Sequence, residues 1–159
     1  MSFLDRSGAL FSSRSEEWGT PKALYDALDR EFQFTLDPAA TAENFKCAKY
    51  FTKEQDGLQQ DWSKERVFLN PPYGSGIGKW MQKIATADCE IAVALVHARC
   101  DTKWWHSWVE PYADEIRFVK GRIKFEGGKY SSTFPSVIVI YRNGQTRRRW
   151  GQSIGANNA

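Results

Sequence analysis

The chain has 159 residues, of which 42% are hydrophobic and 26% charged, and its formal net charge is +3. This length and composition predict one globular domain with a real core, and no apolar run approaches membrane-spanning length. The three cysteines form no CxxC pair, which argues against a disulfide framework or a cysteine zinc site, and no apolar signal core is seen at the N-terminus, so we expect a cytosolic protein.

The start of the chain predicts a loose arm followed by an amphipathic helix. Residues 1–17 are polar, rich in serine and weakly patterned. In WGTPKALYDALDREF, Thr20 is a suitable N-cap and Pro21 suits the first helical position. The apolar residues that recur at helical spacing are Leu24, Leu28 and Phe32.

Short apolar segments further along predict the strands of a sheet. They are 34–37, 49–51, 66–69, 90–96, 115–119 and 134–141. Helices are predicted around Trp80 and Ile84 and over 103–110, which Pro111 ends. The alternation predicts an α/β fold with a largely parallel sheet, and the last two strands, joined without a helix, predict an antiparallel edge. We therefore expect one domain over 18–142 and a basic tail over 143–159.

Asp37-Pro38 and Asn70-Pro71-Pro72-Tyr73 each follow a predicted strand, where ligands of parallel α/β sheets bind. Two prolines cannot continue a central strand because they offer no ladder donors. One interpretation of the second segment is a stiff loop. The other is catalytic: the carbonyls of the Asn70 side chain and of Pro71 would accept hydrogen bonds from one NH2 group and make its nitrogen a better nucleophile. Tyr73 offers a ring on which a nucleobase can stack.

Several segments of the sequence together resemble a known family. Asn70–Tyr73 resembles the catalytic motif of S-adenosylmethionine-dependent amino-methyltransferases. With WGTP, LDPAATAENFKC, YFTKEQDGLQQDW and FPSVIVIYR, it resembles the small phage and prophage DNA N-6-adenine methyltransferases, from about Trp18 to Arg142. The resemblance implies a Rossmann-like methyltransferase fold with a mostly parallel sheet and an antiparallel C-terminal hairpin strand. It implies site-specific methylation of adenine N6 in double-stranded DNA, in the cytoplasm of a bacterial host.

The resemblance also assigns catalytic roles. Asn70 and Pro71 would accept from the adenine amino group, Pro72 would shape the turn, and Tyr73 would stack on a base flipped out of the duplex. The methyl group would pass directly from sulfonium to nitrogen, and no metal is expected.

For S-adenosylmethionine, the resemblance implies an acidic-Pro turn, matched by Asp37, Pro38, Ala39 and Ala40 in place of the glycine-rich turn of many methyltransferases. The remaining cofactor positions are Trp18, Thr20 and Pro21 for the methionine end, Asp61 for the adenine, and Asp56 or Glu54 for the ribose hydroxyls. Asp37-Pro38 as an ordinary turn and Asp61 as a turn cap are the structural alternatives.

The basic residues are unevenly distributed, which indicates either a polyanion-binding surface or a solvated basic face. With the resemblance, we expect the hairpin at 117–130 to hold DNA, with the arginines at 147–149 as a further candidate region. The DNA-binding candidates are Lys120, Arg122, Lys124, Lys129 and Arg99. His97, His106 and at least two of the tryptophans of 103–110 are expected to be structural.

Three other functions fit parts of the sequence. A protein glutamine methyltransferase can use the same Asn-Pro-Pro-Tyr motif on side-chain amides, and a cytosine amino-methyltransferase is close in chemistry, although Ser commonly leads its motif. A non-catalytic DNA-binding module would bind DNA without S-adenosylmethionine. The sequence leaves open the recognised DNA site, the preferred strand state and the oligomeric state.

Overall fold

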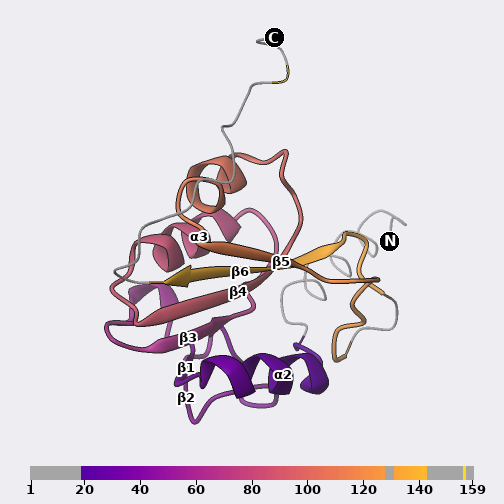
Figure 1. The fold of residues 1–159 in the computed structure, drawn as a ribbon. Coiled ribbons are helices and arrows are strands. Elements are labelled where there is room, and N and C mark those ends of the chain that lie inside the picture. Colours follow the sequence, from indigo (N-terminus) through magenta and orange to yellow (C-terminus); the bar gives the residue numbers. More distant parts are fainter. Residues whose placement is uncertain (1–18, 128–130, 143–155, 157–159) are drawn as a thin grey trace, which may run out of the picture.

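The computed structural model describes residues 19–127, 131–142 and 156, which form a six-stranded sheet with helices on both faces (Figure 1). The strands are β1 (Leu36–Asp37), β2 (Lys49–Tyr50), β3 (Arg66–Leu69), β4 (Ile91–His97), β5 (Glu115–Phe118) and β6 (Ser136–Arg142). The helical elements are α2 (Lys22–Phe32), the 3-10 turn η1 (Gly57–Gln59), α3 (Ile77–Thr86) and the π-helical η2 (Trp105–Val109).

The strand order is β2-β1-β3-β4-β6-β5, and the sheet is mostly parallel. β2, β1, β3 and β4 pair in parallel, whereas β6 is antiparallel to both β4 and β5. The predicted antiparallel pair is therefore present. These two strands form one edge of the sheet, as predicted, with β6 inserted between β4 and β5 and β5 outermost.

Two apolar layers hold the sheet between its helices. β3 and β4 alternate their buried side chains, so that Phe68 and Val93 pack beneath α2 while Val67 and Ala92 pack against α3. Figure 1 shows α2 on one face of the sheet and α3 and η2 on the other. β4 is buried on both faces, as its continuous apolar sequence predicts.

Two helices differ from the sequence-based expectation. α2 begins at Lys22 with Pro21 as its N-cap, and no side chain caps it; the predicted cap, Thr20, is instead 2% exposed against a pocket. The predicted helix over 103–110 contains a π-helical segment, in which the Glu110 amide donates to the Trp105 carbonyl at 2.9 Å. Its tryptophans pack against the core, as expected.

Candidate active site

A pocket of about 370 Å³ lies where β1 and β3 end side by side. Its volume is typical of small-molecule sites. Asp37 closes β1 and Asn70 follows β3, so the two motifs that the sequence predicts at this edge share one cavity. The lining includes Thr20, Asp37, Pro38, Ala39, Asp56, Gly57, Asn70 and Pro72.

The Asp37 carboxyl group is the buried acid of the pocket, because the residue is only 4% exposed. Its Oδ2 atom accepts a hydrogen bond from the Lys46 amide at 3.0 Å. Burial raises the pKa of this carboxyl to about 6, against the opposing effect of the hydrogen bonds from the Lys46 and Ala39 amides. A positively charged group bound beside this carboxylate would offset the cost of its burial. Lys46 and Lys53 also line the pocket.

Part of the pocket wall is the η1 turn, which is held very close to the turn that follows β1. A Cβ atom on Gly57 would lie 2.0 Å from the Pro38 carbonyl oxygen, so only glycine fits there. Lys83 of α3 donates to the carbonyls of Leu58 at 2.9 Å and Gln60 at 2.5 Å. The Trp62 indole donates to the Gly57 carbonyl at 2.9 Å. These contacts fix the turn that carries Asp56 into the pocket lining.

The four residues after β3 point in different directions. Asn70 and Pro72 line the pocket, whereas Pro71 is buried. Tyr73 is partly exposed, but its hydroxyl group donates to the Leu95 carbonyl at 3.1 Å, and burial raises its pKa above the ordinary value. The motif thus places an amide in the pocket and a ring beside it.

His97, for which the sequence predicts a structural role, lies against this motif. Its ring stacks on that of Tyr73 with centroids 3.9 Å apart and planes 1° apart, and its Nε2 atom lies 3.2 Å from the Ser132 Oγ. Burial, and then the charge of Arg99, lower the pKa of His97 to about 4, so the imidazole is neutral at pH 7. The only sequence signal for this contact is that His97 ends the strand next to β3.

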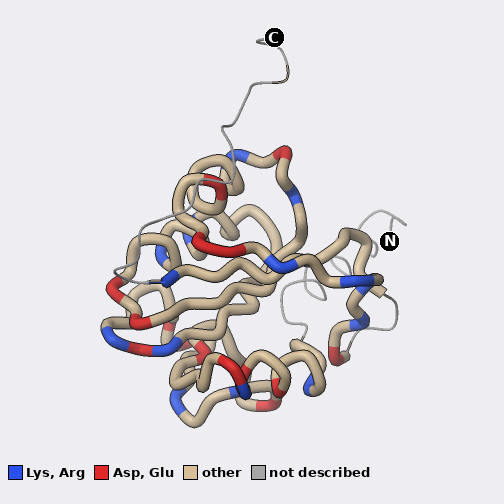
Figure 2. The backbone as a smooth tube through the Cα atoms, viewed as in Figure 1, with Lys and Arg blue, Asp and Glu red and all other residues tan. Residues whose placement is uncertain are grey.

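Residues 119–127, here called the basic arm, extend from the end of β5 and return to the pocket. Ile123 and Phe125 are buried, and the Phe125 ring meets Tyr73 edge-on at 6.4 Å. Glu126 pairs with Gly19, a pocket-lining residue, through two backbone hydrogen bonds. Figure 2, which colours the backbone by residue type, shows Lys and Arg positions along this arm, at the right of the molecule.

Comparison with known proteins assigns the chain to a family. A model of the DNA N-6-adenine-methyltransferase (Dam) family matches residues 8–153. The chain belongs to the Dam family. It is 38% identical to the DNA N-6-adenine-methyltransferase of Escherichia phage T1 over 145 residues, 89% of this chain and 58% of the phage protein. The chain therefore spans less than two thirds of that relative's length.

A second relative is the Escherichia coli (strain K12) protein named "Putative methyltransferase YfdM". It is 37% identical over 65 residues, which cover 36% of this chain and 71% of that protein.

The predicted cofactor residues of this Dam-family chain divide into three groups. Thr20, Asp37, Pro38, Ala39 and Asp56 all line the pocket. Pro21 and Glu54 do not line it; nor does Asp61, whose carboxylate accepts from the Ser63 amide at 2.8 Å and hydroxyl at 2.6 Å. Asp61 therefore has the turn-capping geometry named as the alternative. Trp18 lies outside the described residues.

The predicted DNA-binding residues also differ in their surroundings. Lys120, Arg122 and Lys124 are exposed on the basic arm, although Arg122 donates to the Thr133 carbonyl. Arg99 pairs with Asp101 at 3.1 Å and lies over the Phe134 ring. Arg117 is tied to Glu31 and Glu115, so it belongs to the fold rather than to a free basic surface. Lys129 and the arginines at 147–149 lie outside the described residues.

Neither a membrane-spanning helix nor a metal centre is found in the described part of the chain. Its helices are too short or too polar to cross a membrane. Within residues 19–127, 131–142 and 156, no group of three or more His, Cys, Asp or Glu side chains is arranged to hold a metal ion.

Proposed function

We propose that this chain is an S-adenosylmethionine-dependent DNA adenine methyltransferase that acts on the N6 amino group of an adenine flipped out of duplex DNA. The observation that carries the proposal is that Asn70 and Asp37 line one pocket. Membership of the Dam family supports the adenine specificity. We also propose a Rossmann-like methyltransferase fold. This is supported by the mostly parallel sheet, the helices on both of its faces and the pocket at its carboxyl edge.

The volume of the pocket and its buried carboxylate support the binding of S-adenosylmethionine there. When bound, this cofactor supplies an electrophilic methyl group on a positively charged sulfur. The buried Asp37 carboxylate would balance positive charge on the ligand, and the close approach of Gly57 to Pro38 shapes the wall. Thr20, which would hold the methionine end, lines the pocket. Asp56, rather than Glu54, also lines it and could hold a ribose hydroxyl.

Asn70 and Pro71 would act on the adenine amino group. A side-chain carbonyl and a main-chain carbonyl that accept from the two N–H bonds draw electron density onto the nitrogen, so its lone pair is less delocalised into the ring. The nitrogen would then attack the methyl carbon as a neutral nucleophile, so that the carbon–nitrogen bond forms as the carbon–sulfur bond breaks. The sulfur would leave as an uncharged thioether, and the nitrogen would then lose one proton to solvent. Because the prolines fix the backbone, the two acceptors need no reorganisation during the reaction.

The ring of Tyr73 would support the flipped adenine. His97 covers one face of this ring, and the Tyr73 hydroxyl is anchored on β4, so the ring is held in place before DNA binds. The proposal therefore puts the adenine on the opposite face. Base–aromatic stacking of this kind contributes roughly 1–3 kcal/mol.

The test is single-turnover methyl transfer from labelled S-adenosylmethionine to unmethylated DNA. We expect Asn70→Ala to lower the rate by about 100-fold or more, because this variant removes a preorganised hydrogen-bonding group at the reacting atom. Its affinity for the cofactor should stay close to that of the unmodified chain. Gln82→Ala, which removes an amide from the exposed surface of α3, is the matched control and should leave both values unchanged. An Asn70→Ala variant with the full rate would contradict the proposal.

A further inference from the structure

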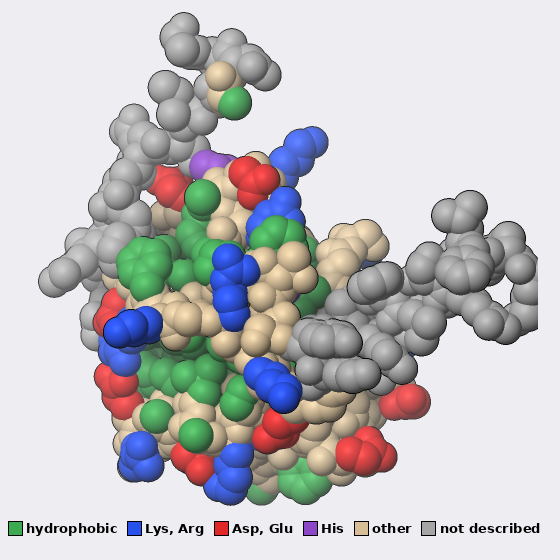
Figure 3. All heavy atoms as spheres, turned by 90° about the vertical axis from the view of Figure 1, so that its right-hand side faces the viewer, with side chains coloured by type: hydrophobic (Ala, Val, Ile, Leu, Met, Phe, Trp, Pro, Cys, Tyr) green, Lys and Arg blue, Asp and Glu red, His purple; other side chains and the backbone are tan. Residues whose placement is uncertain are grey.

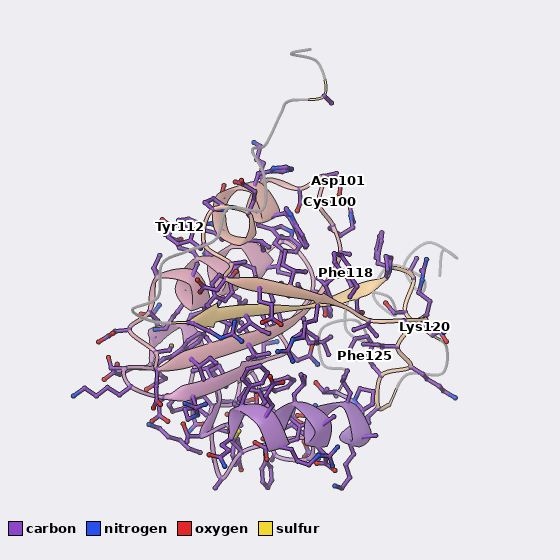
Figure 4. All side chains as sticks on the ribbon, in the orientation of Figure 1. Cys100, Asp101, Tyr112, Phe118, Lys120 and Phe125 are labelled. Atoms are coloured by element: carbon purple, nitrogen blue, oxygen red, sulfur yellow. The ribbon has the colours of Figure 1, made fainter. Side chains whose placement is uncertain are left out.

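Phe118, the last residue of β5, is an exposed aromatic side chain that the site described above does not use. It is 81% exposed, and Figure 4 labels it near Lys120 and Phe125 at the right of the molecule. The other large hydrophobic residue that is exposed in the described part of the chain, Phe45, is 46% exposed and stacks on Tyr50 at 4.4 Å. Phe118 thus presents far more ring surface to solvent than Phe45 does.

The sheet topology places Phe118 on the same edge as the pocket. β6 is antiparallel to both of its neighbours, so β5 runs in the same direction as β3 and β4. Its last residue therefore lies at the edge where Asp37 and Asn70 lie. Three strand spacings separate β3 from β5, which is roughly 14 Å. This is comparable to the major groove of DNA, about 12 Å wide, so one duplex can reach both places.

The basic arm joins Phe118 to the pocket and carries positive charge between them. Lys120, Arg122 and Lys124 are exposed, whereas Ile123 and Phe125 between them are buried. The arm reaches the rim of the pocket at Glu126, which pairs with Gly19. Figure 3, which faces the right-hand side of Figure 1, shows Lys and Arg side chains spread over this side of the molecule. Exposed cations in this arrangement suit a phosphate backbone.

We propose that Phe118 enters the base stack of the bound duplex beside the target adenine and fills the space that the flipped base leaves. Lys120, Arg122 and Lys124 hold the phosphates that flank this position. Apolar side chains that insert between base steps unstack and open the duplex, and an exposed ring at the same edge of the sheet as the pocket meets this requirement. This inference rests on the proposed function, because it needs a base that leaves the stack.

The experiment compares two duplexes that share one target adenine, mapped beforehand on unmethylated DNA. In one duplex the adenine is paired with thymine, and in the other it faces an abasic position, so that flipping needs no base pair to be broken. We expect Phe118→Ala to lower the methylation rate on the paired duplex by at least 10-fold, since flipping costs a few kcal/mol. On the abasic duplex its rate should be close to that of the unmodified chain. Phe118→Trp, which keeps a flat ring, should retain most of the rate on both.

Variants of the basic arm should show a different pattern on the same two duplexes, because they weaken binding to DNA rather than base flipping. The triple variant Lys120→Ala, Arg122→Ala and Lys124→Ala should bind both duplexes more weakly and reduce the slope of log affinity against log salt by about 0.9 for each phosphate that is no longer neutralised. The abasic position should not rescue it. Lys64→Ala removes an exposed lysine that precedes β3, at the opposite edge of the sheet, and should leave the slope unchanged.

Three outcomes would overturn the inference: an unchanged rate for Phe118→Ala on the paired duplex, an equal decrease on both duplexes, or a change in oligomeric state that accounts for the decrease. The last would assign Phe118 to an interface with a second copy. Failure of the proposed function looks different, because the unmodified chain would then transfer no methyl group to either duplex. A 2-aminopurine target reports flipping directly: its fluorescence should rise with the unmodified chain and not with Phe118→Ala.

Discussion

At the scale of single residues, Asp37 combines a folding cost with a proposed binding role. Burial raises its pKa to about 6, from an ordinary value of 3.8. Between about pH 4 and pH 6, Asp37 is therefore protonated in the folded chain and ionised in the unfolded chain. The free energy of unfolding therefore falls as pH rises from about 4 to about 6. At pH 7 the cost is at most about 3 kcal/mol.

Asp37→Asn tests both roles. We expect a higher melting temperature at pH 7 and no difference below about pH 4, together with weaker affinity for S-adenosylmethionine. In the unmodified chain, cofactor affinity should weaken as pH falls through about 6, because the carboxylate becomes protonated. Calorimetry at pH 5 and pH 8 measures this. Equal affinity at the two values, or full binding by Asp37→Asn, would remove Asp37 from the site.

The residues that sequence alone identified are those whose chemistry is local. Asn70-Pro71-Pro72-Tyr73 is unusual after a buried strand. Asp37-Pro38 comes at the end of another predicted strand, and ligands of parallel α/β sheets bind at the carboxyl ends of the strands. The stacking of His97 on Tyr73 and the exposure of Phe118 cannot be predicted from the sequence, because they depend on which ring lies opposite and on exposure in the folded state. Asp61 shows the opposite case, since a short motif suggested the pocket and the fold turns the side chain toward Ser63.

At the scale of elements, the pocket depends on the close approach of the η1 turn to the β1 turn. Gly57 has no room for a Cβ atom, because the Pro38 oxygen would lie 2.0 Å away and Trp80 3.2 Å away. Backbone atoms cannot move aside as a flexible side chain can. A side chain here must therefore push the turn off the pocket wall.

Gly57→Ala should lower the melting temperature, and it should also lower the affinity for S-adenosylmethionine by at least 10-fold. The matched control is Gly78→Ala in α3, where the nearest atom to a new Cβ is the Trp104 Cβ at 3.8 Å, an ordinary contact. Replacing this helical glycine should stabilise the chain by up to about 1 kcal/mol and leave cofactor binding unchanged. Equal behaviour of the two variants in calorimetry would contradict the described packing of the pocket.

The elements that sequence predicted best are those with strong apolar patterns. β3 spans the predicted residues 66–69, and β4 differs from the predicted 90–96 by one residue at each end. The weaker predictions concern backbone whose partners are distant in sequence. Thr20 lines the pocket and does not cap α2. The arm between β5 and β6 pairs with Gly19 through Glu126, and no local sequence pattern predicts this pairing.

At the scale of the whole molecule, the fold gathers its distinctive features at one edge of the sheet. The pocket, the Tyr73–His97 stack, the basic arm and Phe118 all lie beyond the carboxyl ends of the parallel strands. The opposite edge carries ordinary ion pairs, such as Arg66 with Glu90 at 2.7 Å. Net charge alone could not reveal this arrangement, because the total of +3 is small and its position on the surface depends on the fold.

The most direct test of the proposed activity is the identity of the labelled nucleoside after the chain has acted on unmethylated DNA with labelled S-adenosylmethionine. We predict N6-methyl-2′-deoxyadenosine as the labelled product, formed by the unmodified chain and not by Asn70→Ala. Label on cytosine, label on protein glutamine instead of DNA, or binding of DNA without any transfer would each contradict the proposed activity.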